Sequence, residues 1–307
     1  MSKKIIRKII TFLLKYSFSK KIDDLLLWPV SKRLFSNYSE IVETKKGLKI
    51  KVYGDMEDMV NKILLFSSKY VNLAWEPGTA RLIDFLANRS KVSVVAGSHI
   101  GYYPLIIGSN NPGNIVYALE PNPNNFIRCK ENVKLNNLDN IKVIEKALGK
   151  NIGKEKMYFD FGQSSLVSSS REHKGEGLVN VTTLDQLAKE IDKPIDLVIL
   201  DAEGYEENII LGGENLLKIN KPTIIFELNE KALVDAGSSS KKLTNLLLGQ
   251  GYSLFVIDEG SHKINFDNNV KIKLVPINNF NFLGSCSFVN VVAIIDIKLV
   301  NQYVYKE

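Results

Sequence analysis

The stretch KVSVVAGSHIGYYPL, residues 91–105, decides the fold of this 307-residue chain. A short apolar run at residues 92–96 leads into a loop of small residues at 97–101, and the segment that follows reads as an amphipathic helix. A strand that ends in such a loop and continues into a helix is typical of nucleotide-binding domains, because Gly97 and Gly101 let the backbone approach a ligand closely. Alone this pattern is weak evidence, since similar turns occur in many α/β proteins.

Strand-like and helix-like runs alternate over the rest of the chain. The strand-like runs are residues 92–96, 114–119, 141–144, 196–200, 223–228, 252–257 and 289–295. The helix-like runs are residues 102–108, 123–136, 184–190, 206–217 and 240–249. This alternation predicts a parallel sheet that is covered by helices on both faces. The apolar runs DLVILD and TIIFEL suit buried central strands of such a sheet.

The positive charge of the chain is concentrated at one end. The formal net charge is +6, and residues 1–33 hold nine basic and two acidic residues, so this segment has a charge of +7 and the remainder −1. The sheet-forming part of the chain therefore gives no reason to expect a nucleic-acid partner.

Cysteine and histidine usage excludes two further classes of protein. Cys129 and Cys286 form no disulfide framework, and His99, His173 and His262 are too scattered for a structural zinc site. The cysteine usage fits a reducing compartment, and we expect a cytoplasmic protein. No apolar run is long and uninterrupted enough to read as a membrane span.

The N-terminal region differs from the rest of the chain. Residues 3–16, KKIIRKIITFLLKY, have apolar side chains at helical spacing and basic side chains largely on the other side. Such a helix suits peripheral contact with an anionic membrane surface, or packing against the domain or a partner. Residues 41–54 alternate as a strand or hairpin would. We therefore expect an N-terminal extension over residues 1–74 and an α/β domain over 75–307.

Two of the predicted strands end in acidic residues. Glu120 follows the second strand, about 20 residues after the glycine loop, where a carboxylate accepts hydrogen bonds from the hydroxyls of a ribose. Alternatively, Glu120 is only an acid at the start of the helix that begins with Pro123. Asp201 and Glu203 follow the fourth strand, where they either take part in chemistry or serve as helix-capping acids.

Several segments of the chain occur in the order typical of one enzyme family. They are VVAGSHIGYY, YALEPNPNNFIRCKENVKLNN, EKALG, GQSSL, VTTLDQL, DLVILDAEGYEENIILGG and IIFELNE. In this order they resemble FkbM-type methyltransferases over roughly residues 75–260. The resemblance implies S-adenosylmethionine as cofactor and a class I Rossmann-like fold, with a mostly parallel seven-stranded sheet. It also implies O-methylation of a hydroxyl on a sugar, a glycan or a small metabolite.

The resemblance also implies a role for each candidate site residue. The cofactor-binding candidates are Gly97, Ser98, His99 and Gly101 for the methionine end, Glu120, Pro121 and Asn122 for the ribose, and Lys146 and Ala147, beside Glu145, for the adenine. The candidates near the reacting groups are Asp201 and Glu203, with Ser164, Ser165 and Glu227 toward the acceptor. No metal is implied.

Two positions depart from the family pattern. Val95 stands where the family usually has an acid that helps to fix the cofactor's ammonium group, and Ile199 stands where it tends to have lysine. Loss of a charged hydrogen bond weakens binding by about 1–3 kcal/mol, which is roughly tenfold to a hundredfold in affinity. His99, in the position of an asparagine, offers a substitute polar group.

We expect Glu203 to act as general base, Asp201 to orient the cofactor or acceptor, and His99 to be the second candidate base. Two alternatives remain. One is a domain that kept the fold but lost catalysis and serves as a partner-binding or membrane-associated module. The other is an NAD-linked oxidoreductase, which the missing Gly-x-Gly-x-x-Gly pattern disfavours. The oligomeric state cannot be read from the sequence.

Overall fold

The computed structural model describes residues 3–16, 28–35, 38–44, 47–53, 58–67, 75–159, 164–167, 175–259, 271–277 and 288–304. The chain forms two compact units. Unit 1 comprises Met1–Arg81 and Glu259–Lys271, and unit 2 comprises Leu82–Asp258 and Ile272–Glu307. His173, His262 and Cys286 lie outside the described residues. The domain boundary expected between residues 74 and 75 stays a prediction.

Unit 1 contains the helix and the hairpin that the sequence predicts. Its elements are α1 (Lys3–Tyr16), α3 (Trp28–Phe35), β1 (Ser39–Glu43), β2 (Lys49–Tyr53) and α4 (Met59–Ser67). The antiparallel β1–β2 hairpin packs against α4, and α1 packs against α3 and α4. The rings of Phe35 and Phe66 meet edge to face in this core, with their centroids 5.9 Å apart.

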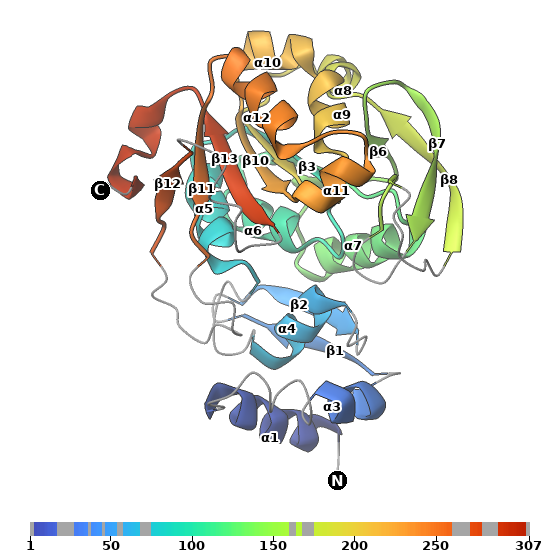
Figure 1. The fold of residues 1–307 in the computed structure, drawn as a ribbon. Coiled ribbons are helices and arrows are strands. Elements are labelled where there is room, and N and C mark those ends of the chain that lie inside the picture. The colour runs from blue at the N-terminus through green and yellow to red at the C-terminus, as the bar shows by residue number, and fades with distance from the viewer. Residues whose placement is uncertain are drawn as a thin grey trace. The chain divides into compact units, whose positions relative to one another are not determined.

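Unit 2 is built on an eight-stranded sheet (Figure 1). Its strands are β3 (Val92–Ala96), β4 (Ile115–Leu119), β5 (Ile141–Ile144), β9 (Leu197–Leu200), β10 (Thr223–Leu228), β11 (Ser253–Ile257), β12 (Leu274–Pro276) and β13 (Val289–Ile294). They lie in the order β12-β11-β13-β10-β9-β3-β4-β5. The pairs among β3, β4, β5, β9 and β10 are parallel, whereas β13 is antiparallel to both of its neighbours. The predicted Rossmann-like α/β fold is confirmed, with the short strand β12 as an addition at one edge.

The strand order reverses beside β3. From β3 the chain proceeds outward through β4 to β5, and later returns to place β9 and β10 on the other side. In open α/β sheets, ligands bind outside the carboxyl ends of the strands at such a switch point. The loops that follow β3, β4 and β9 therefore form the expected site.

Helices cover both faces of this sheet (Figure 1). Helix α5 (Pro77–Ala87) leads into β3, and α6 (Tyr102–Asn110) and α7 (Pro123–Leu135) lie on one face. The other face is covered by α8 (Leu184–Ile191), α9 (Glu206–Leu211), α10 (Glu214–Asn220), α11 (Glu230–Asp235) and α12 (Ser240–Gly249). The short 3₁₀ helices Ile297–Leu299 and Asn301–Tyr303 follow β13.

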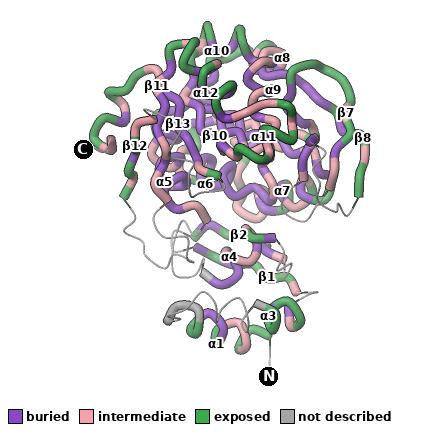
Figure 2. Tube along the Cα trace, in the orientation of Figure 1, coloured by how far each residue is buried: buried purple, intermediate pink, exposed green. Residues whose placement is uncertain are grey.

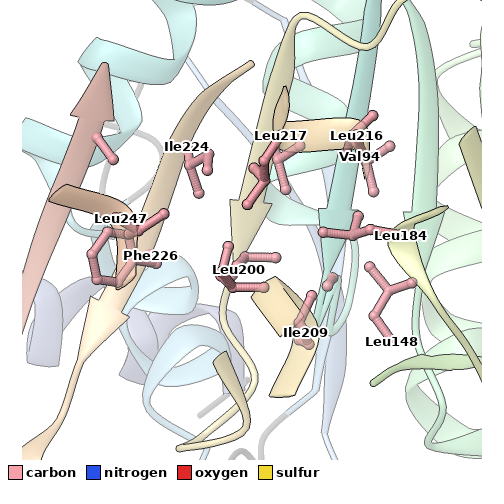
Figure 3. Packing of buried hydrophobic residues seen from close by; sticks show 14 of the residues in the cluster. Val94, Leu148, Leu184, Leu200, Ile209, Leu216, Leu217, Ile224, Phe226 and Leu247 are labelled. Atoms are coloured by element: carbon pink, nitrogen blue, oxygen red, sulfur yellow. The ribbon is translucent and has the colours of Figure 1, made fainter. Parts of the chain in front are cut away.

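A single apolar layer joins the second set of helices to the sheet. Figure 3 shows Leu200 and Phe226 of the strands among Leu184, Ile209 and Leu247 of the helices. Complete burial of a side chain of this size stabilises a fold by about 1.5–3 kcal/mol. The strand ends that carry the polar site residues are thus anchored in a dry core.

Two helix predictions need correction. The helix α6 is not amphipathic: its residues from Tyr102 to Gly108 are all buried, as Figure 2 shows, because it contains no charged side chain that needs water. The helix expected over residues 206–217 is divided into α9 and α10 at Gly212 and Gly213. At this break the Gly212 carbonyl accepts a hydrogen bond from the Asp185 N–H at 3.0 Å, which a continuous helix would not allow.

A small three-stranded sheet was not predicted. It comprises β6 (Ala147–Leu148), β7 (Gly153–Phe159) and β8 (Gly175–Thr182), with β7 and β8 paired as an antiparallel hairpin. Four buried side chains form its core: Ala147, Met157, Val179 and Val181. Residues 164–167 lie against this hairpin, because Ser165 forms an isolated antiparallel bridge with Tyr158 of β7.

Candidate active site at the carboxyl edge of the sheet

The loop after β3 is held by its backbone against two neighbouring strands. The N–H groups of Gly97 and Ser98 donate to the Leu119 carbonyl at 3.1 and 3.0 Å. Gly97 has φ +77°, and a Cβ at this position would lie 1.8 Å from the Asp201 carbonyl oxygen. Only glycine fits so close to the end of β9. The loop is therefore fixed between the ends of β4 and β9, where the sequence predicted it.

Glu120 is clamped at the end of β4 by two backbone donors. The His99 N–H donates to its Oε2 at 2.7 Å, and the Asn122 N–H donates to its Oε1 at 2.9 Å. Glu120 is only 4% exposed, and burial raises the pKa of its carboxyl to about 7. The carboxyl is thus rigid and changes its charge near neutral pH.

Asp201 follows β9 and shares the electrostatic environment of Glu120. Its N–H donates to the Ala96 carbonyl at 3.0 Å, which ties the end of β9 to the end of β3. Burial raises the pKa of the Asp201 carboxyl to about 6, while the charge of His99 opposes this shift. The negative charge of Asp201 in turn contributes to the raised pKa of Glu120. The structure therefore brings the three strand ends together.

Glu203 lies on a tight turn whose backbone N–H groups donate hydrogen bonds to the carboxylate of Glu206. Glu203 itself has φ 51°, a left-handed conformation that is costly for a residue with a side chain. The Oε1 of Glu206 accepts from the Ala202 N–H at 2.9 Å and from the Gly204 N–H at 3.4 Å. Glu206 is 1% exposed, and burial raises the pKa of its carboxyl to about 7. This supporting role of Glu206 was not identified from the sequence.

Residues 164–167 connect the ends of β4 and β9. The Asn122 side-chain amide donates to Ser164 Oγ at 3.0 Å, and Ser165 Oγ donates to the Glu203 carbonyl at 3.0 Å. The Val167 N–H donates to the same Ser165 hydroxyl at 3.0 Å. Ser164 and Ser165 therefore lie at the predicted site, and Ser165 contacts the backbone of the proposed base.

Other predicted site residues lie less centrally. The Ala147 side chain packs in the core of the small sheet, and Lys146 is half-buried beside it. Their predicted contact with adenine stays a prediction. Glu227 lies within β10 opposite Asn290 of β13, so β9 separates its strand from β3.

The two departures from the family pattern are direct neighbours. Val95 and Ile199 are register partners on the adjacent strands β3 and β9, and both side chains are buried. Register partners on neighbouring strands point to the same face of a sheet. An apolar pair thus occupies the place where the family pattern has an acid and a lysine. Replacing a buried ion pair by well-packed apolar side chains is often neutral or stabilising.

The donors and acceptors of the site fit a ribose. A carboxylate has about four lone-pair positions, and the backbone N–H groups of His99 and Asn122 use two of those on Glu120. A vicinal diol can donate to the remaining positions, and such donation favours the charged form of a buried carboxyl. Among the described residues, no group of three or more acidic, histidine or cysteine side chains is arranged to hold a metal ion.

Comparison with known proteins identifies one matching family model. The model is described as "Methyltransferase FkbM domain" and matches residues 96–254, which is just over half of the chain. The match includes the glycine loop, Glu120, Asp201 and Glu203.

The individual proteins that the chain resembles share less than a third of its residues over the matched regions. The chain is 28% identical over 95 residues to a tRNA(Phe) (4-demethylwyosine(37)-C(7)) aminocarboxypropyltransferase of Methanocaldococcus jannaschii, a match that covers 29% of this chain and 38% of that protein. Among solved structures, a methyltransferase FkbM from Methylobacillus flagellatus is 16% identical with a TM-score of 0.43, over 66% of this chain and 43% of that one. An O-methyltransferase from Bacillus cereus is 14% identical with a TM-score of 0.40, over 72% and 84% of the two chains.

Proposed function

Because the chain belongs to the FkbM family of methyltransferases, we propose that it methylates a hydroxyl group of a sugar, a glycan or a small metabolite in the cytoplasm. S-adenosylmethionine is the cofactor of this family and of this chain. The observation that supports the proposal most directly is the meeting of the glycine loop, Glu120 and Asp201 at the switch point of the sheet.

The cofactor would be held by three groups of residues. Glu120 would accept the ribose hydroxyls, since its carboxyl is already oriented by two backbone donors. The loop of residues 97–101 would contact the methionine end, and Lys146 and Ala147 would flank the adenine. When bound, the cofactor supplies an electrophilic methyl group that is attached to a good leaving group.

Glu203 is the proposed general base. A hydroxyl acceptor becomes a stronger nucleophile when a carboxylate accepts its proton as the new C–O bond forms. The turn that presents Glu203 is fixed by Glu206 and Ser165, which restricts the positions that its side chain can reach. Positioning of this kind supplies much of the rate in a transfer that needs little other protein chemistry.

The remaining site residues are assigned to orientation and to the acceptor. Asp201 would orient the cofactor or the acceptor, and His99 is the second candidate base. Ser164, Ser165 and Glu227 would lie on the acceptor side. Acceptor contacts from several directions would select the hydroxyl that meets the methyl group.

The test is Glu203→Gln, with Glu190→Gln on α8 as a matched control far from the site. Methyl transfer from radiolabelled S-adenosylmethionine to sugar, glycan and small-metabolite acceptors is measured, together with calorimetric binding of S-adenosylhomocysteine. We expect Glu203→Gln to lower the transfer rate about a hundredfold or more while product binding is retained. A wild-type rate would contradict the role of Glu203. Failure of the wild-type chain to bind the cofactor would instead favour the non-catalytic binding module.

A further inference from the structure

Helix α1 is fixed to unit 1 by one of its faces. Ile10 and Thr11 are buried, and Arg7 donates to the Leu65 carbonyl at 3.1 Å. The same guanidinium forms an ion pair with Glu40 at 3.3 Å. These contacts join α1 to the hairpin and to α4, so its orientation on the unit is defined.

The opposite face of α1 exposes large apolar side chains. Ile5, Ile9 and Leu13 recur every four residues and are 49%, 45% and 46% exposed, and the adjoining Phe12 is 62% exposed. Residues four apart lie on one side of a helix, so these side chains form a continuous stripe. A single exposed apolar residue is ordinary, whereas a contiguous stripe marks a surface that binds something apolar.

Basic side chains border this stripe. Lys4 and Lys8 are exposed one turn apart, and α1 contains no acidic residue. The first 33 residues of the chain together have a charge of +7. A helix with an apolar stripe and flanking lysines matches a lipid surface, where acyl chains lie beneath negatively charged headgroups.

We propose that α1 docks the protein on an anionic membrane surface. Ile5, Ile9 and Leu13 enter the boundary between headgroups and acyl chains, and Lys4 and Lys8 pair with lipid phosphates. The helix lies in the plane of the interface; none of the helices in the described part of the chain is long and apolar enough to cross a bilayer. This inference is independent of methyl transfer, because it depends only on the surface of unit 1.

The test is co-sedimentation of the full chain with vesicles of phosphatidylcholine, either alone or mixed with phosphatidylglycerol. We expect binding to the mixed vesicles, and binding weaker by about tenfold to neutral vesicles and at high salt. The double variant Ile5→Ser/Ile9→Ser removes part of the stripe, and Lys4→Glu/Lys8→Glu reverses the charges. Each is expected to lower partitioning at least about tenfold.

The matched control is Leu178→Ser/Ile219→Ser, which removes two apolar side chains of unit 2 that are even more exposed, at 74% and 80%. It is expected to leave vesicle binding unchanged, and circular dichroism checks that every variant is folded. Equal loss of binding in this control, or no preference for anionic vesicles, would overturn the proposal. The proposal would also be overturned if the wild-type protein were a dimer that binds no vesicles and if the double variant Ile5→Ser/Ile9→Ser dissociated that dimer. The stripe would then contact a second copy of the chain.

Discussion

Glu120 is a buried carboxyl that titrates near neutral pH, and its ionisation is coupled to ligand binding. Burial raises its pKa to about 7, and hydroxyl donors from a ribose would favour the charged form. Below this pKa the carboxyl must lose a proton before it can accept both hydroxyls. Its contribution to affinity is therefore present above the pKa and is lost as the pH falls through it.

The first prediction follows from this coupling. S-adenosylhomocysteine is expected to bind roughly tenfold more tightly at pH 8 than at pH 6, as measured by calorimetry. Glu120→Gln should bind more weakly at pH 8 and should lose this part of the pH dependence. The comparison of the two proteins removes the titration of the ligand's own amino group. An identical pH profile in the two proteins would exclude Glu120 from the ribose site.

Val95 and Ile199 form a buried apolar pair, and we expect replacement of either side chain by a charged one to destabilise the fold. A charge introduced on one side chain would be buried without a partner, which costs about 3–5 kcal/mol. We predict that Val95→Asp and Ile199→Lys each lower the free energy of unfolding by amounts of this order. The double variant should recover part of the loss, measured as a coupling energy in denaturant titrations. Additive losses would show that the two positions do not interact.

Several elements of the fold could be predicted to the residue. The bounds of β3, β5, β10 and α12 agree with the sequence runs, because the strands are apolar and bounded by polar or turn residues. Apolar periodicity over residues 206–217 did not reveal the division at Gly212, where the backbone accepts a hydrogen bond from Asp185, which is distant in sequence. The small β6–β7–β8 sheet escaped prediction because β7 is largely polar and exposed, and only one face of the hairpin is buried.

Residues 164–167, which lie between β7 and β8, support the turn that follows β9. Ser165→Ala removes the hydroxyl that joins this segment to the Glu203 carbonyl and accepts the Val167 N–H. We expect a several-fold rise in the acceptor KM, because the turn after β9 loses the hydrogen bond that holds the Glu203 carbonyl. The binding of S-adenosylhomocysteine should change little. Ser109→Ala on α6 is the control. An unchanged acceptor KM would show that the Ser165 contact does not position the turn.

The candidate site could be predicted only where strand ends decide it. Gly97, Glu120 and Asp201 each follow a strand, and the switch point of the sheet brings such positions together. Glu206 was missed because its two acceptor contacts are made around a turn with left-handed backbone at Glu203. An acid in the first turn of a helix that follows a glycine-containing loop is the signal that could have identified it.

The whole molecule is expected to respond to pH through its buried carboxyls. Glu120, Asp201 and Glu206 have pKa values raised to about 7, 6 and 7, above those of the unfolded chain. At pH values between the unfolded and the folded pKa values, the folded state therefore binds more protons than the unfolded state. Their stabilising contribution is complete below the unfolded pKa values and is lost as the pH rises through 6 to 7.

The corresponding prediction concerns the free energy of unfolding without cofactor. Between pH 5.5 and 8, each of these carboxyls lowers it with rising pH by at most about 1.4 kcal/mol per pH unit. Glu206→Gln keeps an acceptor oxygen for the Ala202 N–H and should reduce the slope, whereas the exposed control Glu190→Gln should not. Urea titrations across this range provide the measurement. A slope that is unaffected by Glu206→Gln would refute the assignment.

The position of β13 has a consequence for folding of the chain during its synthesis on the ribosome. This strand follows both β10 and β11 in the sequence but lies between them in the sheet (Figure 1). Until translation has passed Ile294, both of those apolar strands are without the neighbour that separates them. The nascent chain must therefore keep two open edges apart from each other and from other polypeptides, so it is vulnerable to misassembly until β13 has been made.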